Sequence, residues 1–388
     1  MKTSAKAACI LTAIVGFWLA VFTTAFAGEP IATKAKQVFM IEAETGTILL
    51  NKNADQLVQS ASLMKLMTAD YVFHLLETNS LSLDTEYTVS EHAWRTGGAL
   101  SRTSTMFAAL KSRIRVEDLL KGLIVQQAND ACIILAEGIS GSDAAFTEKL
   151  NARAREIGLK KSTFANASGL PDPGNRMTMR ELVMLSRDLH DNYPEYFPYF
   201  AMREFEWNKI KQRNRYPLFA SVEGSDGFAT GYSEEDGYGI VATVERNGVR
   251  LYLAMSGLSS PKEREDEARN ILEWGLSAFE RRQIFAAGEV IGDVPVYGGA
   301  DSHVPVAAKT PVAIFQDKRL PDRVTARIAY DWPFKAPVEK GAKVGALRLY
   351  NGEEVLQEVP VYAQNDVGGG SLLGRALDAV WELLFFWL

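Results

Sequence analysis

Ser62 and Lys65 stand three residues apart in the segment "QSASLMKLMTADYVFHLL". In a helix this spacing puts both side chains on one face, and a serine in the first turn would lie where free N–H groups favour a developing negative charge. The segment is apolar nearly all round, which predicts a buried helix, and burial lowers the pKa of a lysine. A neutral lysine amine beside a serine hydroxyl is a general base beside a nucleophile. The alternative is a capping serine and a snorkelling lysine, because S-x-x-K alone is a weak pattern.

The elements around this pair mix helices with antiparallel hairpins. The chain has 388 residues, of which 47% are hydrophobic and 23% charged, so it can form two globular domains. Thr45-Gly46 and Asn247-Gly248 each separate two β-rich runs, which predicts hairpins. Beyond Gln283, short β-rich runs split by Gly and Pro predict a small all-β domain that acts as a spacer or interaction module. Helical patterns cover 61–76, 116–126, 130–139, 144–157, 178–190 and 263–279.

Residues 1–27 have the composition of a secretory signal peptide. Lys2 and Lys6 precede an apolar run that is short for a bilayer span, and Ala25-Phe26-Ala27 forms a small-x-small cleavage site. An uncleaved membrane anchor is the alternative. We therefore expect an exported, periplasmic protein.

The mature chain is acidic. Without Lys2 and Lys6, the 42 basic residues become 40 against 48 acidic ones, a net charge of −8. Because phosphate binding needs a positive surface, nucleic acid is not an expected partner. Cleavage would leave Cys132 as the only cysteine, so no internal disulfide could form, and its apolar neighbours favour a small buried side chain over a reactive thiol.

The C-terminal residues 367–388 predict a hinge followed by a membrane anchor. "NDVGGG" has the composition of a flexible linker, and "SLLGRALDAVWELLFFWL" follows it. In a helix, Arg375, Asp378 and Glu382 would share one narrow face, while Leu, Val, Trp and Phe would cover the rest. We expect an amphipathic helix that lies on the inner-membrane surface. A helix docked on the body of the protein is the alternative.

In this context the sequence resembles the serine D-alanyl-D-alanine carboxypeptidases, the low-molecular-weight penicillin-binding proteins. S-x-x-K is the element that penicillin-binding proteins share with β-lactamases. The resemblance implies that Ser62 is the acyl-ester nucleophile and Lys65 its base. It also implies an α+β fold, with an antiparallel sheet flanked by helices over 28–282 and a β-rich domain over 283–366. The resemblance covers essentially the whole mature chain, through "MIEAETGTILLNKNAD", "SASLMKLMTADYV", "LLKGLIVQQANDACIILAEGISGS", "STFANASGLPDP", "DGFATGYSEEDGYGIVATV" and "APVEKGAKVGALRLYNGEEVLQEVPVYA".

Two motifs depart from the family pattern. S-x-N aligns with Gln127-Ala128-Asn129, so Asn129 remains to bind the substrate amide, but Gln127 stands where a serine would shuttle a proton. K-T-G aligns with Ala229-Thr230-Gly231. Thr230 can still meet the substrate carboxylate and Gly231 still permits close approach, but Ala229 supplies no charge. Arg215 in "QRNR" resembles a family arginine near that carboxylate and is the candidate for the missing cation. A solvated basic loop is the alternative.

These departures predict weakened activity. A hydrogen bond to a charged group is worth roughly 1.5–3 kcal/mol, and a positioned acid–base group contributes about 10²–10⁴-fold in rate. We therefore expect an attenuated carboxypeptidase that trims the terminal D-alanine from peptidoglycan pentapeptides, with no metal or cofactor and with β-lactams as further ligands. On the same estimate, a lysine restored at position 229 would raise the rate at least about tenfold.

Two other functions remain as alternatives. A non-catalytic homologue could bind muropeptides or act as a scaffold at the membrane. A β-lactamase is disfavoured, because nothing in the sequence indicates an added deacylation carboxylate.

Overall fold

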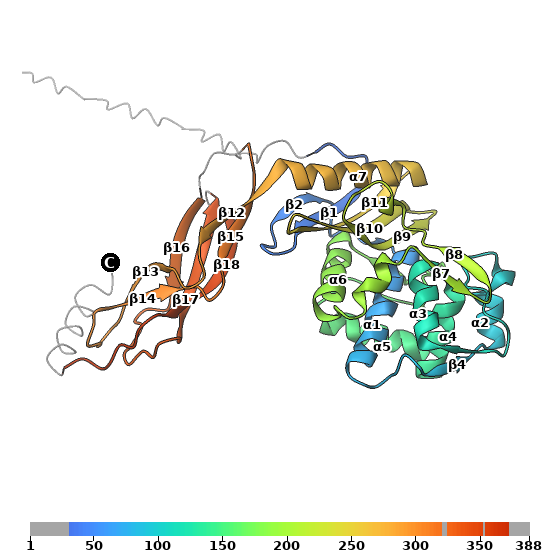
Figure 1. Ribbon diagram of the computed structural model, residues 1–388, viewed down its shortest axis with the longest axis horizontal. Helices are drawn as coiled ribbons and strands as arrows, with labels where there is room; N and C mark the ends of the chain where they lie inside the picture. The colour runs from blue at the N-terminus through green and yellow to red at the C-terminus, as the bar shows by residue number, and fades with distance from the viewer. Residues whose placement is uncertain (1–30, 320–323, 352–353, 372–388) are drawn as a thin grey trace, which may run out of the picture.

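The chain folds into an α+β part followed by a β-rich part (Figure 1). The computed structural model describes residues 31–319, 324–351 and 354–371. The expected signal peptide and the expected C-terminal helix lie outside the described residues. The predicted α+β fold with a following all-β domain is confirmed.

A five-stranded antiparallel sheet in the order β2-β1-β11-β10-β9 is the centre of the first part. Asn247 and Gly248, between β10 and β11, have φ angles of 55° and 77°. This is the backbone conformation that a two-residue hairpin turn requires, so the predicted hairpin is confirmed. β9 is an edge strand, which leaves one side of it open. The strands of the sheet are β1 (Gln37–Glu42), β2 (Ile48–Lys52), β9 (Ser225–Ser233), β10 (Gly237–Arg246) and β11 (Val249–Leu258).

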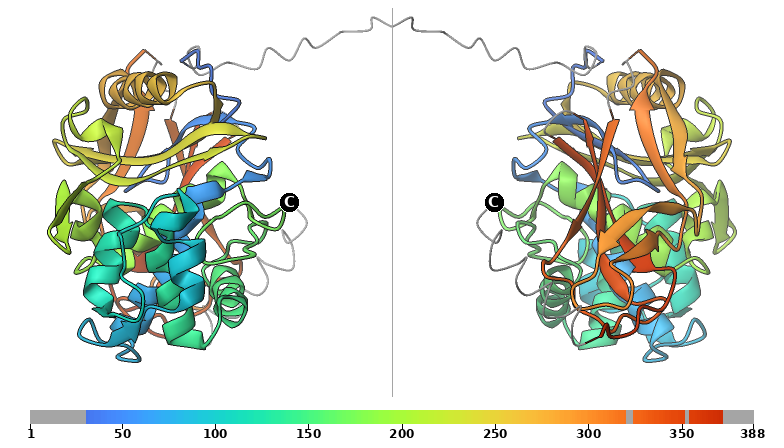
Figure 2. Two further views of the ribbon diagram at one scale, coloured as in Figure 1. Left: turned by 90° about the vertical axis from the view of Figure 1, so that its right-hand side faces the viewer. Right: turned by 90° about the vertical axis from the view of Figure 1, so that its left-hand side faces the viewer.

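Helices cover both faces of this sheet (Figure 2). Along β1, Val38 and Met40 pack in the core beneath α7, whereas Phe39 and Ile41 belong to the core shared with the other helices. This alternation follows from the two-residue period of a strand, which turns successive side chains to opposite faces. The helices are α1 (Lys65–Glu77), α2 (Glu91–Thr96), α3 (Val116–Val125), α4 (Asn129–Ser140), α5 (Asp143–Glu156), α6 (Met179–Asn192) and α7 (Pro261–Ala278).

Short segments complete the first part. Two-stranded ladders pair β3 (Val58–Gln59) with β6 (Arg176–Met177), β4 (Glu86–Thr88) with β5 (Arg113–Arg115), and β7 (Glu204–Trp207) with β8 (Ile210–Arg213). Turns of 3-10 helix are η1 (Ala61–Met64), η2 (Ala99–Ser101), η3 (Phe197–Ala201) and η4 (Pro217–Phe219).

The start of α7 follows from its sequence. The Ser260 hydroxyl accepts a hydrogen bond from the Glu263 N–H at 3.1 Å, and Pro261 occupies the first turn. Both features stabilise a helix N-terminus. Proline has no backbone N–H that would be left without a partner, and the serine hydroxyl accepts from an N–H that would otherwise have none. The predicted helix at 263–279 therefore begins two residues earlier, at Pro261.

The β-rich part begins directly after α7. The predicted boundary between residues 282 and 283 falls inside β12, which starts at Phe279 and pairs with β15. The rings of Phe279 and Phe315 stack at 5.6 Å, and Phe279 also contacts the Trp274 ring of α7 at 5.1 Å, so this strand pair packs against the C-terminal end of α7. The other strands form a sheet in the order β13-β14-β18-β17-β16 with its own apolar core. Their bounds are β12 (Phe279–Phe285), β13 (Val290–Pro295), β14 (His303–Ala307), β15 (Val312–Asp317), β16 (Val324–Tyr330), β17 (Lys343–Asn351) and β18 (Glu354–Ala363).

The segment predicted as a flexible hinge is instead bound to the β-rich part. Val367 exchanges backbone hydrogen bonds with Val338 at 2.8 and 2.9 Å and is buried. The Gly370 N–H donates to the Gly298 carbonyl at 2.8 Å. A Cβ at Gly370 would lie 2.4 Å from the Gly299 carbonyl oxygen, so the glycine permits close packing of two chain segments there. Glycine content alone does not distinguish this use from flexibility.

Candidate active site

Ser62 and Lys65 form a polar pair at the start of α1. The Lys65 Nζ lies 3.3 Å from the Ser62 Oγ. Ser62 belongs to the 3-10 turn Ala61–Met64, and α1 itself begins at Lys65. The sequence predicts Ser62 in the first turn of the helix, and the structure places it in the tighter turn that leads into the helix. The spacing of three brings the two side chains together in either geometry.

Lys65 is buried in the core, with 2% of its surface exposed. Burial lowers the pKa of Lys65, because the ammonium form loses its hydration, and the positive charge of Arg215 lowers it further. The Nζ also donates to the backbone carbonyl of Ser168. The amine is therefore held beside the Ser62 hydroxyl in surroundings that favour its neutral form.

The loop that carries the Ser168 carbonyl is itself fixed. The side-chain oxygen of Asn166 accepts hydrogen bonds from the N–H groups of Ser168 and Gly169, at 3.2 and 2.7 Å. Gly169 has a φ of 76°, and a Cβ there would lie 2.0 Å from the Ala61 carbonyl oxygen. Ser168 is not predicted as a site residue, because a backbone carbonyl leaves no signature in residue type.

Asn129 and Gln127 lie at the junction of α3 and α4. The Asn129 side-chain amide donates to the Thr103 hydroxyl at 3.0 Å. Gln127 has a left-handed backbone, with a φ of 54°, and only 8% of its surface is exposed. Its Oε1 accepts a long hydrogen bond of 3.5 Å from the Thr230 hydroxyl on β9. The second and third motifs therefore contact each other directly.

Asp130, next to Asn129, holds the loop opposite. Its two carboxylate oxygens accept from the Thr105 hydroxyl at 2.6 Å and from the N–H groups of Met106 and Ala108, at 3.0 and 3.1 Å. The loop that it fixes continues from Thr103 and Ser104, which meet Asn129 and Arg215. Asp130 is thus a positioning residue, which the sequence alone does not predict.

β9 brings the third motif close to Ser62. A Cβ added to Gly231 would lie 3.0 Å from the Leu63 Cγ and 3.4 Å from the Ser60 carbonyl oxygen. Gly231 therefore allows the close approach that the sequence predicts for it. Ala229 and Thr230 are both buried, with 5% and 7% exposed.

Arg215 is the basic residue of the "QRNR" region that reaches the cavity. Its Nη1 donates to the Ser104 hydroxyl at 3.0 Å, and its backbone N–H donates to the Val125 carbonyl at 3.4 Å. Of the neighbouring cations, Lys209, Lys211 and Arg213 belong to the exposed β7–β8 hairpin and do not line the cavity.

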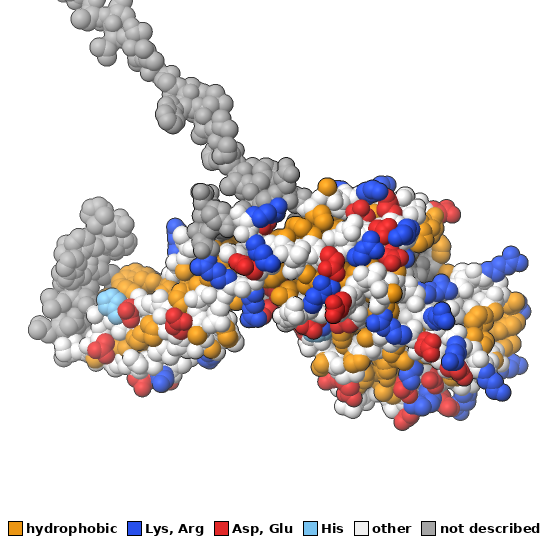
Figure 3. Space-filling model, turned by 45° about the horizontal axis from the view of Figure 1, so that its top comes forward, with side chains coloured by type: hydrophobic (Ala, Val, Ile, Leu, Met, Phe, Trp, Pro, Cys, Tyr) orange, Lys and Arg blue, Asp and Glu red, His pale blue; other side chains and the backbone are white. Residues whose placement is uncertain are grey.

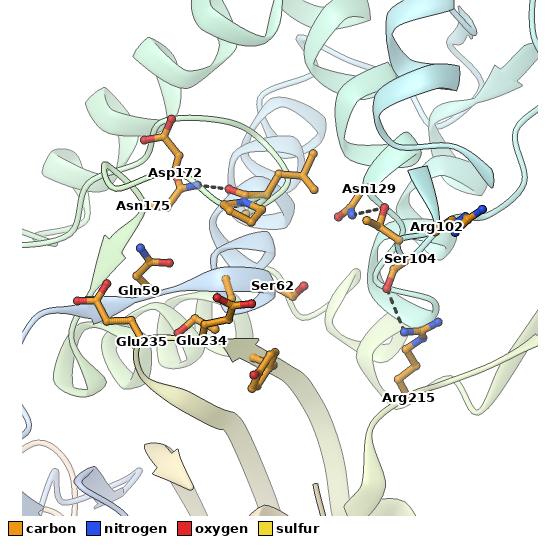
Figure 4. Close-up of a pocket in the computed structure, with 17 residues that line it drawn as sticks. Gln59, Ser62, Arg102, Ser104, Asn129, Asp172, Asn175, Arg215, Glu234 and Glu235 are labelled. Carbon is orange, nitrogen blue, oxygen red and sulfur yellow. Dashed lines mark hydrogen bonds between the residues drawn. The ribbon is translucent and has the colours of Figure 1, made fainter. Parts of the chain in front are cut away.

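The Ser62 side chain points into a cavity of about 900 Å³ between two charged walls (Figure 4). Arg102 and Arg215 lie on the side of Asn129, and Glu234 and Glu235 lie on the opposite side. Arg102 and the two glutamates were not predicted as part of the site. The complete lining is Gln59, Ala61, Ser62, Arg102, Thr103, Ser104, Asn129, Gly169, Leu170, Pro171, Asp172, Asn175, Arg215, Tyr232, Ser233, Glu234 and Glu235.

Both parts of the chain match known families. The family described as D-alanyl-D-alanine carboxypeptidase matches residues 23–259, and the one described as penicillin-binding protein 5, C-terminal domain, matches residues 279–368. The D-alanyl-D-alanine carboxypeptidase DacA of Haemophilus influenzae is 31% identical over 356 residues, which are 91% of this chain and 90% of that protein. DacF of Bacillus subtilis is 29% identical over 368 residues, 92% of this chain and 93% of that protein.

Solved structures agree with these matches. Penicillin-binding protein 5 from Haemophilus influenzae superposes with a TM-score of 0.78 at 31% identity, over 88% of this chain and 99% of that chain. The ampicillin-bound form of penicillin-binding protein D2 from Listeria monocytogenes has a TM-score of 0.56 at 27% identity and covers 64% of this chain and 100% of that chain. With Ser62 beside a buried lysine in the matched region, the chain belongs to the serine D-alanyl-D-alanine carboxypeptidase family, the low-molecular-weight penicillin-binding proteins.

Proposed function

We propose that this chain removes the terminal D-alanine from peptidoglycan pentapeptides through an acyl-enzyme on Ser62. The observation that carries the proposal is the Lys65 Nζ, 3.3 Å from a Ser62 Oγ that points into the cavity. A general base must lie within hydrogen-bond reach of the proton that it abstracts, and a neutral amine can accept that proton.

The reaction proceeds in two halves. The Ser62 Oγ attacks the carbonyl carbon between the two D-alanines while Lys65 takes the hydroxyl proton. The backbone N–H of Ser62 is the candidate donor to the oxyanion that forms. The carbon–nitrogen bond then breaks, Lys65 returns the proton to the leaving amine, and free D-alanine departs. In the second half a water molecule gives a proton to Lys65 and attacks the carbonyl carbon of the acyl ester. The bond from that carbon to the Ser62 Oγ then breaks, Lys65 returns the proton to the Ser62 Oγ, and the shortened peptide leaves.

The activity is attenuated in this proposal. A glutamine amide can hydrogen-bond but is a poor proton carrier, so Gln127 does not relay a proton to the leaving group. Ala229 places no cation near the carboxylate. Arg215, which lines the cavity and is held by Ser104, offsets part of that loss.

A non-catalytic role as a muropeptide-binding scaffold is the second candidate. The contact between Gln127 and Thr230 favours the non-catalytic role. In this contact the Thr230 hydroxyl, which is expected to meet the carboxylate of a carboxypeptidase substrate, donates to the Gln127 Oε1 instead. The cavity with charged walls would serve this function as well.

Labelling with a fluorescent penicillin separates the two candidates. The Listeria relative is known in an ampicillin-bound form, which supports a β-lactam as the probe. We expect covalent labelling of the wild-type protein and none of Ser62→Ala. Release of D-alanine from a pentapeptide then measures the hydrolytic reaction. Wild-type protein that stays unlabelled after long incubation would exclude catalysis through Ser62.

The place of action is also proposed. Residues 1–27 support export to the periplasm, and residues 372–388 support peripheral attachment to the inner membrane. Among the described residues, no helix is long and apolar enough to cross a membrane. Basic and acidic side chains are interspersed over the face shown in Figure 3, which suits a peptide substrate better than nucleic acid.

A further inference from the structure

The charges that line the Ser62 cavity are separated by sign. Among the described residues, the lining cations Arg102 and Arg215 lie on the side of Asn129, and the lining carboxylates lie on the opposite side (Figure 4). The Ser62 side chain lies between the two groups. A peptide with a negative charge at one end and a positive charge further along would therefore bind in one orientation. The carboxylates are those of Asp172, Glu234 and Glu235.

Glu234 is the carboxylate of this group that is left free to bind a ligand. Glu235 accepts two parallel hydrogen bonds from Arg176, at 3.0 and 3.1 Å. Asp172 accepts from the Gly174 N–H at 2.8 Å. Within the described residues, the exposed Glu234 side chain forms no hydrogen bond or ion pair. Its charge therefore remains available to a cation that enters the cavity.

Glu234 also lies close to the nucleophile along the chain. Gly231 packs against the turn that carries Ser62, since a Cβ added to it would lie 3.0 Å from the Leu63 Cγ and 3.4 Å from the Ser60 carbonyl oxygen. Glu234 follows three residues later, so the chain between them spans at most about 11 Å. A substrate that reacts at Ser62 thus has Glu234 within reach of a side chain near the scissile bond.

Tyr232 supplies an apolar surface in the same part of the cavity wall. It stands between Gly231 and Glu234 in the chain, lines the cavity and is 53% exposed. Its ring packs against that of Tyr238 with centroids 4.5 Å apart, which restricts its orientation. A long basic side chain has an apolar stem and a charged head, so the stem can lie on Tyr232 while the head meets Glu234.

We propose that Glu234 is a specificity-determining residue that binds the ammonium group of a long basic side chain in the substrate peptide, on the residue that precedes D-Ala-D-Ala. This inference rests on the proposed function, which places the scissile bond at Ser62. The C-terminal carboxylate then faces Arg102 and Arg215. The Cα of the basic residue is one step of about 3.8 Å from that of the D-alanine whose carbonyl is attacked, so its side chain can extend to the wall opposite the arginines.

Binding to a Ser62→Ala background tests the proposal without catalysis. Calorimetry compares Nα-acetyl-lysyl-D-Ala-D-Ala with its Nα,Nε-diacetyl form, which lacks the ammonium charge. We expect the charged peptide to bind about two- to fivefold more tightly at low salt, which is the range of an exposed ion pair, and the preference to shrink as salt is added. Glu234→Gln should remove the preference and Glu234→Lys should reverse it. Glu195→Gln is the matched control, because Glu195 is an exposed glutamate that does not line the cavity.

The orientation is tested with the same two peptides as C-terminal amides. Arg102→Gln should reduce the preference for the free carboxylate and leave the preference for the ammonium group, and Glu234→Gln should do the opposite. Equal binding of the charged and neutral peptides, no binding of either, or a preference that survives Glu234→Gln would overturn the proposal. Failure of the proposed function is a separate result, in which the protein that keeps Ser62 releases no D-alanine from the charged peptide although the binding preference is present.

Discussion

Lys65 donates a hydrogen bond from its Nζ to the backbone carbonyl of Ser168, a residue 103 positions further along the chain. The same Nζ reaches the Ser62 hydroxyl. A loop from a distant part of the sequence thus sets the direction of the candidate base. Several expected results depend on this arrangement.

Acylation of Ser62 should rise with pH and then level off. Lys65 acts as a base only when neutral, so the rate follows the loss of its proton. Because burial lowers the pKa of Lys65 from its ordinary 10.5, the plateau should be reached at a lower pH than an exposed lysine would require. The rate of penicillin labelling measured across a pH series gives the midpoint.

Arg215→Gln should shift that midpoint to higher pH. The charge of Arg215 is one of the causes that lower the pKa of Lys65, so removing it allows the lysine to hold its proton longer. Lys211→Gln is the matched control, because Lys211 is an exposed cation of β8 that does not line the cavity. A midpoint that moves equally in both variants would contradict a specific effect of Arg215.

Gly169→Ala should remove most of the covalent labelling of Ser62 by penicillin. Its φ of 76° strains any side chain by about 1–2 kcal/mol, and the new Cβ would lie 2.0 Å from the Ala61 carbonyl oxygen. The Ser168 carbonyl would then move away from Lys65. Gly141→Ala provides the comparison, since Gly141 has a φ of 79° with no atom within 4 Å of the added Cβ. The two variants should show similar backbone strain, but only Gly169→Ala should lose labelling.

Asp130→Asn should loosen the wall that holds Arg215. The Thr105 hydroxyl and the Ala108 N–H now donate to one carboxylate oxygen of Asp130. In the variant they would face the amide NH₂, which cannot accept a hydrogen bond. Each of these two bonds is worth roughly 1.5–3 kcal/mol, so we expect the free energy of unfolding to fall by about 3–6 kcal/mol. Urea unfolding measures the loss. Asp118→Asn, in the first turn of α3, should cost less than about 1 kcal/mol.

Gly370→Ala should release the last described segment from the β-rich part. The Cβ would lie 2.4 Å from the Gly299 carbonyl oxygen, whereas a Cβ at Gly368 would meet no atom within 4 Å. Limited proteolysis should therefore cleave near residues 365–371 much faster in Gly370→Ala than in Gly368→Ala. Equal cleavage of the two variants would argue that the segment is not held by this packing.

Truncation after Ser371 should abolish membrane binding and leave the folded parts intact. The cut is placed there because Val367 and Gly370 are bonded to the β-rich part. Co-sedimentation with vesicles that contain anionic lipids compares residues 28–371 with 28–388. Vesicle binding of the shorter chain at the level of the longer one would locate the attachment elsewhere.

Much of the fold could be predicted from local sequence because the signals are local. Asn247-Gly248 specifies a tight turn through its φ angles, and the helical periods of α3 to α7 depend on neighbours three and four residues away. The hinge prediction was wrong for the same reason. Composition records the glycines near residue 370, but the Gly298–Gly299 segment against which Gly370 packs lies far away in the sequence.

The sequence by itself determined the pair of Ser62 and Lys65, since a spacing of three fixes their contact within one turn. It also identified Gln127 and Ala229 as departures, one motif at a time. Only the tertiary structure showed that Gln127 contacts the third motif at Thr230, because β9 and the α3–α4 junction meet through packing between segments about a hundred residues apart. The same packing brought Ser168 to Lys65 and Arg215 to the cavity. Contacts of this kind depend on how the helices cover the sheet, which no local pattern encodes.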